Sequence, residues 1–251
     1  MAISIKTPQE IESMKKSGQI LAKVFEVVEK QFKPGISAKE IDDLIHQEII
    51  AHHATPSFLG YQGYKYSSCI SKNEEVVHGI PYPDKRFMPG DIGSIDIGVY
   101  FEGFHSDAAR TFWIDPIPKE VEKLIQITEE SFYKAIEQAI PGNTIGDMAF
   151  ALQTHAETHG FSVVRDLCSH GIGKKLHEDP LIPNYGTKGK GIKLKEGMTF
   201  AIEPMINMGT YHVLTLSDKW TIITADQKLS AHYENTICIT KDGAEILTSI
   251  C

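Results

Sequence analysis

Gly90-Asp-Ile-Gly-Ser-Ile-Asp96 recurs in degraded form as Gly197-Met-Thr-Phe-Ala-Ile-Glu203, and each copy ends in a carboxylate. The offset between the copies is 107 residues, and Pro34-Gly35 recurs as Pro141-Gly142 at the same offset. A chain that repeats an αβ unit is expected to fold with internal two-fold pseudo-symmetry, which brings equivalent residues to face each other across the centre. The sequence therefore predicts two related halves, each of which supplies a carboxylate to a shared site.

Cysteines and histidines extend the repeat at a different offset. Three residues recur 99 positions later, so that Cys69, His78 and Pro81 match Cys168, His177 and Pro180. The offset of 99 rises again to 107 at Gly90 and Gly197, which indicates an eight-residue insertion in the second copy. We expect the paired acids and the paired histidines to converge on one site.

The composition favours one soluble domain over a membrane or nucleic-acid-binding protein. The 251 residues can form a single domain of two fused halves, and we assign residues 1–251 to it. With 25 basic and 33 acidic residues, the formal net charge is −8, which argues against a surface that follows nucleic-acid phosphates. No apolar run approaches the ~20 residues of a membrane span. The four cysteines form no CxxC pair and no apolar signal segment begins the chain, so we expect a cytoplasmic location.

Each half begins with two predicted helices. Thr7-x-x-Glu10 and Ser37-x-x-Glu40 are capping boxes, and apolar residues follow each of them at helical spacing. In the second half, a long helix is predicted over residues 118–139, and Thr144-x-x-Asp147 opens another. The helices thus follow the same plan in both halves.

The remaining regular structure is predicted to be a largely antiparallel sheet. Six segments are rich in β-branched and aromatic residues and are bounded by Gly, Asp or Pro: 91–100, 103–114, 198–206, 211–216, 219–225 and 234–240. Residues 186–195 contain three glycines and four lysines, which is the composition of a loop.

Asp96 and Asp107 are predicted to lie opposite each other on neighbouring strands. A hairpin that turns near Phe101-Glu102 pairs residues whose numbers sum to about 203, as 96 and 107 do. Like charges that face each other in a ladder, roughly 5 Å apart at Cβ, destabilise a sheet unless something neutralises them. A divalent cation would do so.

Three further residues complete a candidate metal centre. Glu203 precedes a proline, Glu234 lies on a predicted strand, and His170 is flanked by glycine at the mouth of a loop. Each of them alone fits an ordinary structural role, but four carboxylates and one imidazole together suit a pair of divalent ions with a water-derived hydroxide between them. Such a centre would hydrolyse an amide or ester, and its oxygen-rich ligation favours Mn, Fe or Co over a structural zinc.

The motifs around these residues closely resemble those of type I methionine aminopeptidases, and the similarity spans almost the whole chain. The matching stretches are Cys69-Ile-Ser71, Val77-His-Gly-Ile-Pro81, Ile95-Asp96, Gly103-Phe-His-Ser-Asp107, His170-Gly-Ile-Gly173, His177-Glu-Asp-Pro180, Ile202-Glu-Pro204 and Tyr233-Glu-Asn-Thr236. The resemblance implies the pita-bread fold, an α+β fold in which two pseudo-symmetric αβ halves share a curved, mainly antiparallel sheet flanked by helices. It also implies removal of the N-terminal methionine from nascent proteins and peptides whose second residue is small.

The resemblance implies a role for each residue of the centre. Two divalent metal ions (Co, Mn, Fe or Zn) would be held by Asp96, Asp107, His170, Glu203 and Glu234. Asp107 and Glu234 would bridge the ions, and Glu203 would also act as general base and acid for a metal-bridging hydroxide.

The resemblance also implies the residues that contact the substrate. His177 would stabilise the oxyanion, and His78 would contact the scissile amide nitrogen. The methionine pocket would be lined by Tyr61, Tyr64, Cys69, Leu176 and Trp220, whose aromatic and sulfur groups suit a thioether.

Several positions near the pocket depart from the family pattern. Phe58 stands where relatives often carry Cys, and Leu176 stands where Phe is common, so we expect compensating repacking with the methionine preference kept. Gln62 and Lys65 replace His and Pro of many relatives at the rim of the pocket.

Two other classes of function remain open at this stage. Proline-directed and creatinase-like enzymes share the ligand order Asp, Asp, His, Glu, Glu, although they carry an additional N-terminal domain, and the segment His78-Gly-Ile-Pro81 points to the methionine enzymes. A non-catalytic pita-bread protein associated with ribosomes or nucleic acid would have lost metal ligands, and all five are present here.

The implied partners follow from the implied reaction. They are nascent polypeptides with an N-terminal methionine and, transiently, the ribosome, with no membrane and no specific nucleic acid. We expect a monomer, and Met1-Ala2 should itself be a substrate.

Overall fold

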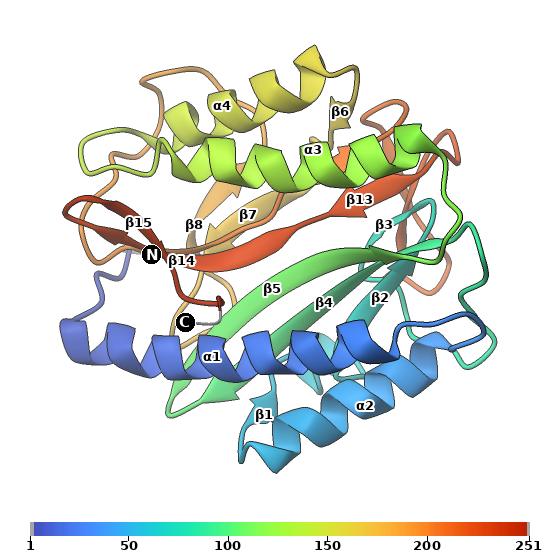
Figure 1. The fold of residues 1–251 in the computed structure, drawn as a ribbon. Coiled ribbons are helices and arrows are strands. Elements are labelled where there is room, and N and C mark those ends of the chain that lie inside the picture. The colour runs from blue at the N-terminus through green and yellow to red at the C-terminus, as the bar shows by residue number, and fades with distance from the viewer. Residues whose placement is uncertain (1–2, 250–251) are drawn as a thin grey trace.

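The computed structural model describes residues 3–249, so the expected removal of Met1 concerns residues outside the described part. Helices α1 (Pro8–Gln31) and α2 (Ala38–Ala51) lie along one half of a curved sheet, and α3 (Lys119–Ile136) and α4 (Ile145–Thr158) lie along the other (Figure 1). The predicted capping boxes are present at Thr7, Ser37 and Thr144. Helix α3 begins one residue later than predicted, after its N-cap Pro118, and ends three residues earlier, at Ile136.

The main sheet contains nine strands. Seven of them lie in the order β1-β4-β5-β14-β9-β7-β8, while β2 pairs with β4 and β15 pairs with β14. Their bounds are β1 Thr55–Pro56, β2 Ser68–Lys72, β4 Ile92–Phe101, β5 Phe104–Trp113, β7 Cys168–Gly171, β8 Glu178–Pro183, β9 Thr199–Ile202, β14 Glu234–Thr240 and β15 Gly243–Ile246.

Two small sheets of three strands complete the β structure. One has the order β13-β10-β6 and the other the order β11-β12-β3, and every strand pair in the described residues is antiparallel. Their bounds are β3 Glu75–Val77, β6 Ser162–Val163, β10 Met205–Asn207, β11 Val213–Thr215, β12 Ile222–Thr224 and β13 Ser230–His232, and a short 3₁₀ helix, η1, spans Tyr61–Gly63.

The predicted strand over 198–206 is interrupted in the structure. Strand β9 ends at Ile202, strand β10 begins at Met205, and Glu203-Pro204 lie between them. Proline has no amide proton to donate to a ladder, so the chain leaves the main sheet there and joins a small one. Of the other five predicted strands, 234–240 is confirmed without change and four are confirmed with shifts of one to three residues at their ends. No helix or strand is assigned over residues 186–195.

The predicted pairing of Asp96 with Asp107 is wrong by two residues. Asp96 pairs with Ala109, Asp107 pairs with Gly98, and the turn is formed by Glu102-Gly103 between Phe101 and Phe104. Two-residue hairpin turns of the common type require positive φ at both positions, and a glycine in the second position favours them. The observed values are +47° at Glu102 and +87° at Gly103. The two aspartates are therefore diagonal neighbours on one face of the hairpin.

The repeat seen in the sequence is confirmed by backbone hydrogen bonds. The Ala38 N–H donates to the Lys85 carbonyl, and the Ile145 N–H donates to the Ile192 carbonyl, with both partners displaced by 107 residues. The isolated bridges Ser37–Arg86 and Thr144–Lys193 keep the same offset. The two halves thus use equivalent main-chain contacts to fix each second helix to the chain before the sheet.

The two faces of β4 divide the core from the site. Ile95, Ile97 and Val99 are fully buried in a cluster with the apolar residues of α1 and α2. Successive side chains of a strand point to opposite faces, so Asp96 points away from the helices.

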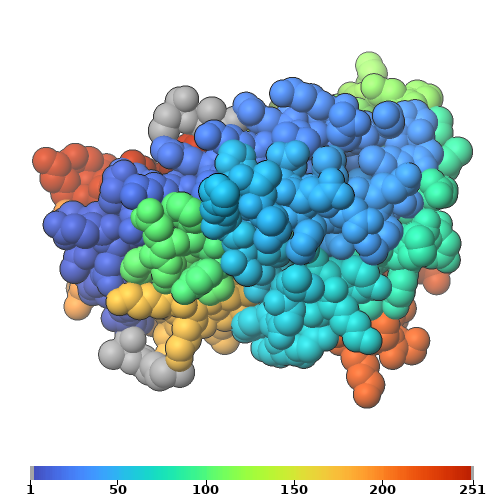
Figure 2. Space-filling model, turned by 90° about the horizontal axis from the view of Figure 1, so that it is seen from below, coloured from blue at the N-terminus to red at the C-terminus, as the bar shows by residue number. Residues whose placement is uncertain are grey.

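At the other end of the hairpin, the His105 N–H donates to the Gly173 carbonyl (2.8 Å), and Figure 2 shows the green hairpin tip beside the yellow-orange segment that contains Gly173.

Candidate metal centre and active-site cavity

Five neighbouring strands of the main sheet each deliver one predicted site residue. Asp96 lies on β4, Asp107 on β5, Glu234 at the start of β14, Glu203 directly after β9, and His170 on β7. These strands are consecutive in the order β4-β5-β14-β9-β7. The curvature of the sheet turns their side chains toward one another, and residues that are far apart in the sequence form one cluster.

Short distances between side-chain atoms define the cluster. One ligand atom each from Asp107, His170 and Glu234 lie within 4.8 Å of one another. The His170 Nε2 atom is also 3.6 Å from Glu203 Oε1. The carboxyls of Asp96 and Asp107 are close enough to share a hydrogen bond.

Several of these carboxylate oxygens are buried and have no hydrogen-bond partner. They are Asp96 Oδ1, Asp107 Oδ1 and Glu234 Oε1, and the Asp107 and Glu234 residues are only 4% and 2% exposed. A buried polar atom without a partner costs roughly 1–3 kcal/mol, and more when it is charged. Oxygen atoms of carboxylates and imidazole nitrogen are the ligands that divalent cations such as Mn²⁺ accept. The residues present therefore fit a divalent metal centre.

Crowding and burial shift the pKa values of the acids upward. Burial raises the pKa of Asp96 to about 7, against the effect of its hydrogen bond with Asp107. Burial also raises the pKa of Glu203 and of Glu234 well above the ordinary value, and repulsion between the neighbouring carboxylates adds to it. Without a cation, these groups cannot all ionise in so small a volume.

The tautomer of His170 suits a metal ligand. Its Nδ1 lies 2.8 Å from the Gly171 carbonyl oxygen, which can only accept, so Nδ1 carries the proton. Burial lowers the pKa of His170 to about 3. The ring is thus neutral, with the Nε2 lone pair directed at the carboxylates, as in most histidines that bind metals.

A cavity of about 430 Å³ opens above the carboxylates. All twelve site residues predicted from the sequence line it: Tyr61, Tyr64, Cys69, His78, Asp96, Asp107, His170, Leu176, His177, Glu203, Trp220 and Glu234. Cys168 also lines the cavity, so both repeated cysteine–histidine pairs converge as expected. Their roles in binding and catalysis stay predictions at this point.

The two repeated histidines are held differently. The His177 Nδ1 atom is 2.8 Å from the Tyr61 hydroxyl, and its ring centroid is 4.2 Å from that of His170. His78 has a φ of +57°, a left-handed backbone conformation that is strained for a residue with a side chain. Burial, with a smaller effect of nearby His177, lowers the pKa of His78 to about 4.

One wall of the cavity is apolar and aromatic. The Tyr64 hydroxyl donates to the Ser68 carbonyl (2.9 Å), and its ring centroid lies 4.9 Å from that of Trp220. Phe58 and Leu176, which depart from the family pattern, lie in the same cluster and are 8% and 2% exposed. The larger residue at position 58 and the smaller one at position 176 therefore lie in the same wall, as compensating repacking requires. The expected methionine preference stays a prediction.

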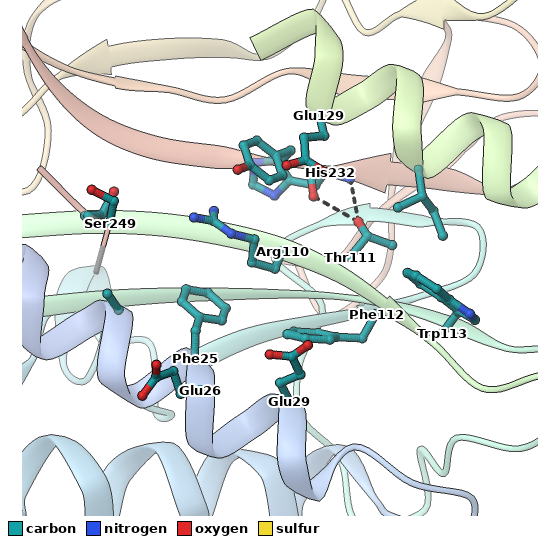
Figure 3. Close-up of a pocket in the computed structure, with 14 residues that line it drawn as sticks. Phe25, Glu26, Glu29, Arg110, Thr111, Phe112, Trp113, Glu129, His232 and Ser249 are labelled. Atoms are coloured by element: carbon teal, nitrogen blue, oxygen red, sulfur yellow. Dashed lines mark hydrogen bonds between the residues drawn. The ribbon is translucent and has the colours of Figure 1, made fainter. Parts of the chain in front are cut away.

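A second cavity, of about 400 Å³, lies on the helix-covered side of the sheet, between α1 and α3 (Figure 3). The Arg110 side chain lies in it, 4.3 Å from the centroid of the Tyr233 ring. Its guanidinium donates to the Glu234 carbonyl (2.5 Å) and to Asn235 Oδ1 (2.7 Å). Arg110 thus supports the start of β14 from behind the metal centre.

The sequence interpretation missed one buried residue of the centre, His232. One atom each from Glu203, His232 and Glu234 lie within 4.8 Å of one another, and His232 is 1% exposed. The only signal in the sequence was its position two residues before Glu234, which places both on the same face of an extended segment.

Comparisons with known proteins agree with this geometry. Residues 12–241 match metallopeptidase family M24, whose members use divalent metal ions. A methionine aminopeptidase of Clostridium perfringens is 52% identical over 248 residues, which cover 99% of both proteins. Methionine aminopeptidase 1 of Bacillus subtilis is 47% identical over 99% of this chain and 100% of its own.

The solved structures give the same result for the fold. A methionine aminopeptidase from Thermotoga maritima has a TM-score of 0.98 to this chain at 45% identity, covering 99% of this chain and 100% of that one. The predicted pita-bread fold is thereby confirmed. Similarity of this extent favours the methionine enzymes over the proline-directed and non-catalytic alternatives. The chain therefore belongs to the methionine aminopeptidases of metallopeptidase family M24.

Proposed function

We propose that this methionine aminopeptidase removes the N-terminal methionine from nascent chains and peptides whose second residue is small, with two divalent ions held by Asp96, Asp107, His170, Glu203 and Glu234. The observation that carries the proposal is the set of buried, unpartnered carboxylate oxygens of Asp96, Asp107 and Glu234, which three neighbouring strands bring to the floor of one cavity. When bound, the ions supply Lewis acidity and a water molecule of lowered pKa.

Glu203 is the proposed proton carrier. It borders the cavity, its side chain is 15% exposed, and it lies outside the ladder between β9 and β10. A carboxylate at this place can take a proton from the attacking water and return it to the departing amine. Its main-chain N–H donates to the Ser169 hydroxyl (2.9 Å), which holds the backbone of the turn in place.

His177 and His78 are the proposed substrate contacts. Burial lowers the pKa of His177, so the ring is neutral near pH 7. If the Tyr61 hydroxyl donates to Nδ1, the proton of the neutral ring is on Nε2, where it can donate to the carbonyl oxygen as negative charge develops. His78 lies in the same cavity and is assigned to the scissile amide nitrogen.

The apolar wall is the proposed methionine pocket. Tyr64, Cys69 and Trp220 supply aromatic and sulfur surfaces, which make favourable contacts with a thioether. Burial raises the pKa of the Cys69 thiol well above its usual range, so this residue offers an uncharged surface to the substrate. Tyr61 and Leu176 complete the wall.

The cellular setting is part of the proposal. The oxygen-rich ligand set favours Mn, Fe or Co over a structural zinc, and we assign the protein to the cytoplasm as a monomer. In the described residues, no helix is long and apolar enough to cross a membrane. Lys188, Lys190, Lys193 and Lys195 are exposed on the 186–195 loop, which supports transient contact with the ribosome.

Peptide hydrolysis tests the proposal. Metal-stripped protein is resupplied with Mn²⁺ or Co²⁺ and incubated with Met-Ala-Ser, Met-Leu-Ser and Leu-Ala-Ser, alongside an Asp96→Asn variant. We expect release of methionine from Met-Ala-Ser alone, dependent on metal and lost in the variant. Hydrolysis of Leu-Ala-Ser at a comparable rate would contradict the pocket, and no hydrolysis despite tight metal binding would contradict the reaction.

A further inference from the structure

His232 lies beside the metal centre and has no role in the reaction proposed above. It ends strand β13, two residues before Glu234, and pairs in register with Met205, two residues after Glu203. Tyr233, between His232 and Glu234, lines the helix-side cavity. His232 also lines that cavity, and its Nε2 atom approaches the Glu234 carboxylate.

Thr111 holds the main chain of His232 at both polar groups. The His232 N–H donates to the Thr111 hydroxyl (3.0 Å), and this hydroxyl donates to the His232 carbonyl (2.9 Å), as the dashed lines in Figure 3 show. Because strand β5 fixes the backbone on both sides of the His232 Cα atom, the imidazole stays oriented toward the carboxylates.

The imidazole nitrogen of His232 is close to two acids. Nε2 lies 3.8 Å from Glu203 Oε2 and 3.8 Å from Glu234 Oε2. Both distances are well beyond the range of about 2.7–3.2 Å for a hydrogen bond from nitrogen to oxygen. His232 is 1% exposed, and Nε2 is buried without a hydrogen-bond partner. A buried imidazole nitrogen aimed at two carboxylates is thus left unsatisfied by the protein itself.

The spacing of these atoms fits a shared cation. Two ligand atoms that lie about 2.1 Å from one ion are at most about 4.2 Å apart, and both 3.8 Å distances fall below this limit. We propose that His232 binds a divalent ion through Nε2, together with Glu203 and Glu234, and so adds a second imidazole to the centre. The inference rests on the proposed function, since it assigns a further ligand to the same centre.

The possible ligands form two overlapping groups, and each group contains one histidine. One group contains Asp107, His170 and Glu234, and the other contains Glu203, His232 and Glu234. Glu234 is the member that they share. In this assignment Glu203 lies between the two imidazoles, with Oε1 3.6 Å from His170 Nε2 and Oε2 3.8 Å from His232 Nε2.

Proton NMR of the Co²⁺-loaded protein tests the assignment without measuring activity. A histidine that binds paramagnetic Co²⁺ through Nε2 keeps its Nδ1 proton, which gives a strongly shifted signal that disappears in D₂O. We expect two such signals in the unaltered protein, one from His170 and one from His232, and one in His232→Gln. Titration of metal-stripped protein should show that His232→Gln weakens the binding of one Co²⁺ about 10–100-fold.

His155 offers a matched control outside the candidate metal centre. This half-buried residue of α4 pairs with Glu130 of α3 (2.8 Å), and His155→Gln should retain both signals. A single shifted exchangeable signal in Co²⁺-loaded unaltered protein, or two signals that persist in His232→Gln, would overturn the assignment of His232 alone. Failure of the protein to bind Co²⁺ would overturn the proposed function together with this inference.

Discussion

The two halves of the molecule share a scaffold and differ in two segments. Helices α2 and α4 are both 14 residues long and begin 107 residues apart. Residues 52–67, between α2 and β2, are longer than their counterpart 159–167, between α4 and β7. The second half regains this length later, because eight residues lie between Pro81 and Gly90 and 16 lie between Pro180 and Gly197.

The two extra segments have different positions relative to the site. Residues 52–67 carry Phe58, Tyr61 and Tyr64, which all line the active-site cavity. The extra residues of the second half include the loop 186–195, which is absent from the cavity lining. The shared scaffold thus supplies the carboxylates, whereas the unshared segment of the first half supplies part of the wall against which a substrate side chain would pack.

The largest loss of activity should come from changes at Asp96 and Glu203. These acids occupy equivalent positions in the two halves but have different proposed roles in the reaction. We expect Glu203→Gln to lower kcat about 10³-fold, because it removes a proton carrier. Asp96→Asn should also abolish activity at low metal concentration, but millimolar Mn²⁺ should restore part of it, since that residue only holds metal. Steady-state kinetics across a Mn²⁺ series would separate the two variants.

A folding control is needed for Glu203→Gln and Asp96→Asn. Circular dichroism should show both variants folded, because a neutral amide replaces a carboxylate of the same shape. If metal restored Glu203→Gln as fully as Asp96→Asn, the two halves would contribute equivalent ligands, and the assignment of proton transfer to Glu203 would be wrong.

Removal of metal should make the stability of the whole protein depend on pH. The raised pKa values of Asp96, Glu203 and Glu234 mean that the folded apoprotein holds protons that the unfolded chain has already lost. Stability then falls as pH rises. Retention of one proton between pH 6.5 and 8 corresponds to on the order of 2 kcal/mol.

The buried histidines change the pH dependence of stability in the opposite direction, but they do so below the range of pH 6.5 to 8. Burial lowers the pKa of His170 to about 3, so its stabilising effect is lost only as pH falls below about 6.5, where the unfolded histidine becomes protonated. Thermal unfolding of metal-stripped protein at pH 6.5 and 8 should show the decrease in Tm, while Mn²⁺-loaded protein and metal-stripped Asp96→Asn should show less. An unchanged Tm in the apoprotein would contradict the raised pKa values.

Features that depend on local sequence were predictable, and features that depend on how distant strands meet were less so. The capping boxes at Ser37 and Thr144 and the repeated acids at Asp96 and Glu203 need only a short stretch of chain to be recognised. The hairpin register was wrong by two residues, because it depends on which residues accept positive φ, and Glu102-Gly103 do so.

Two other features required the tertiary structure. The break at Glu203-Pro204 moves the chain from the main sheet to a small one, and apolar residues on both sides of the break made 198–206 read as one strand. His232 was missed because it belongs to no repeat, and its surroundings come from the ends of β9 and β13 and the start of β14. The family resemblance implied the five acidic and histidine ligands, which stay a prediction, but a residue outside its motifs carried no such signal.

The contrast between the two extra segments predicts a moderate effect on catalysis. Tyr61→Phe removes the hydroxyl 2.8 Å from His177 Nδ1 and with it the contact that selects the tautomer of the ring. We expect kcat on Met-Ala-Ser to fall about tenfold with little change in KM, because the lost interaction acts mainly on the developing oxyanion. The double variant Lys188→Ala/Lys190→Ala in the other segment should change kcat/KM less than twofold. If this variant lost as much activity as Tyr61→Phe, the two segments would not differ in their importance for catalysis.

The smallest expected effects are on stability, and they should be nearly equal in the two halves. They come from the caps of α2 and α4, which belong to the scaffold that the halves share. The Glu40 carboxylate accepts from the Ser37 N–H (2.8 Å) and hydroxyl (2.7 Å). The Asp147 carboxylate accepts from the Thr144 N–H (2.8 Å) and hydroxyl (2.7 Å). Ser37→Ala and Thr144→Ala should therefore each lower the free energy of unfolding by about 1 kcal/mol. Urea unfolding would measure both, and a difference of more than about 1 kcal/mol would show that the two helices are capped with different strength despite their common plan.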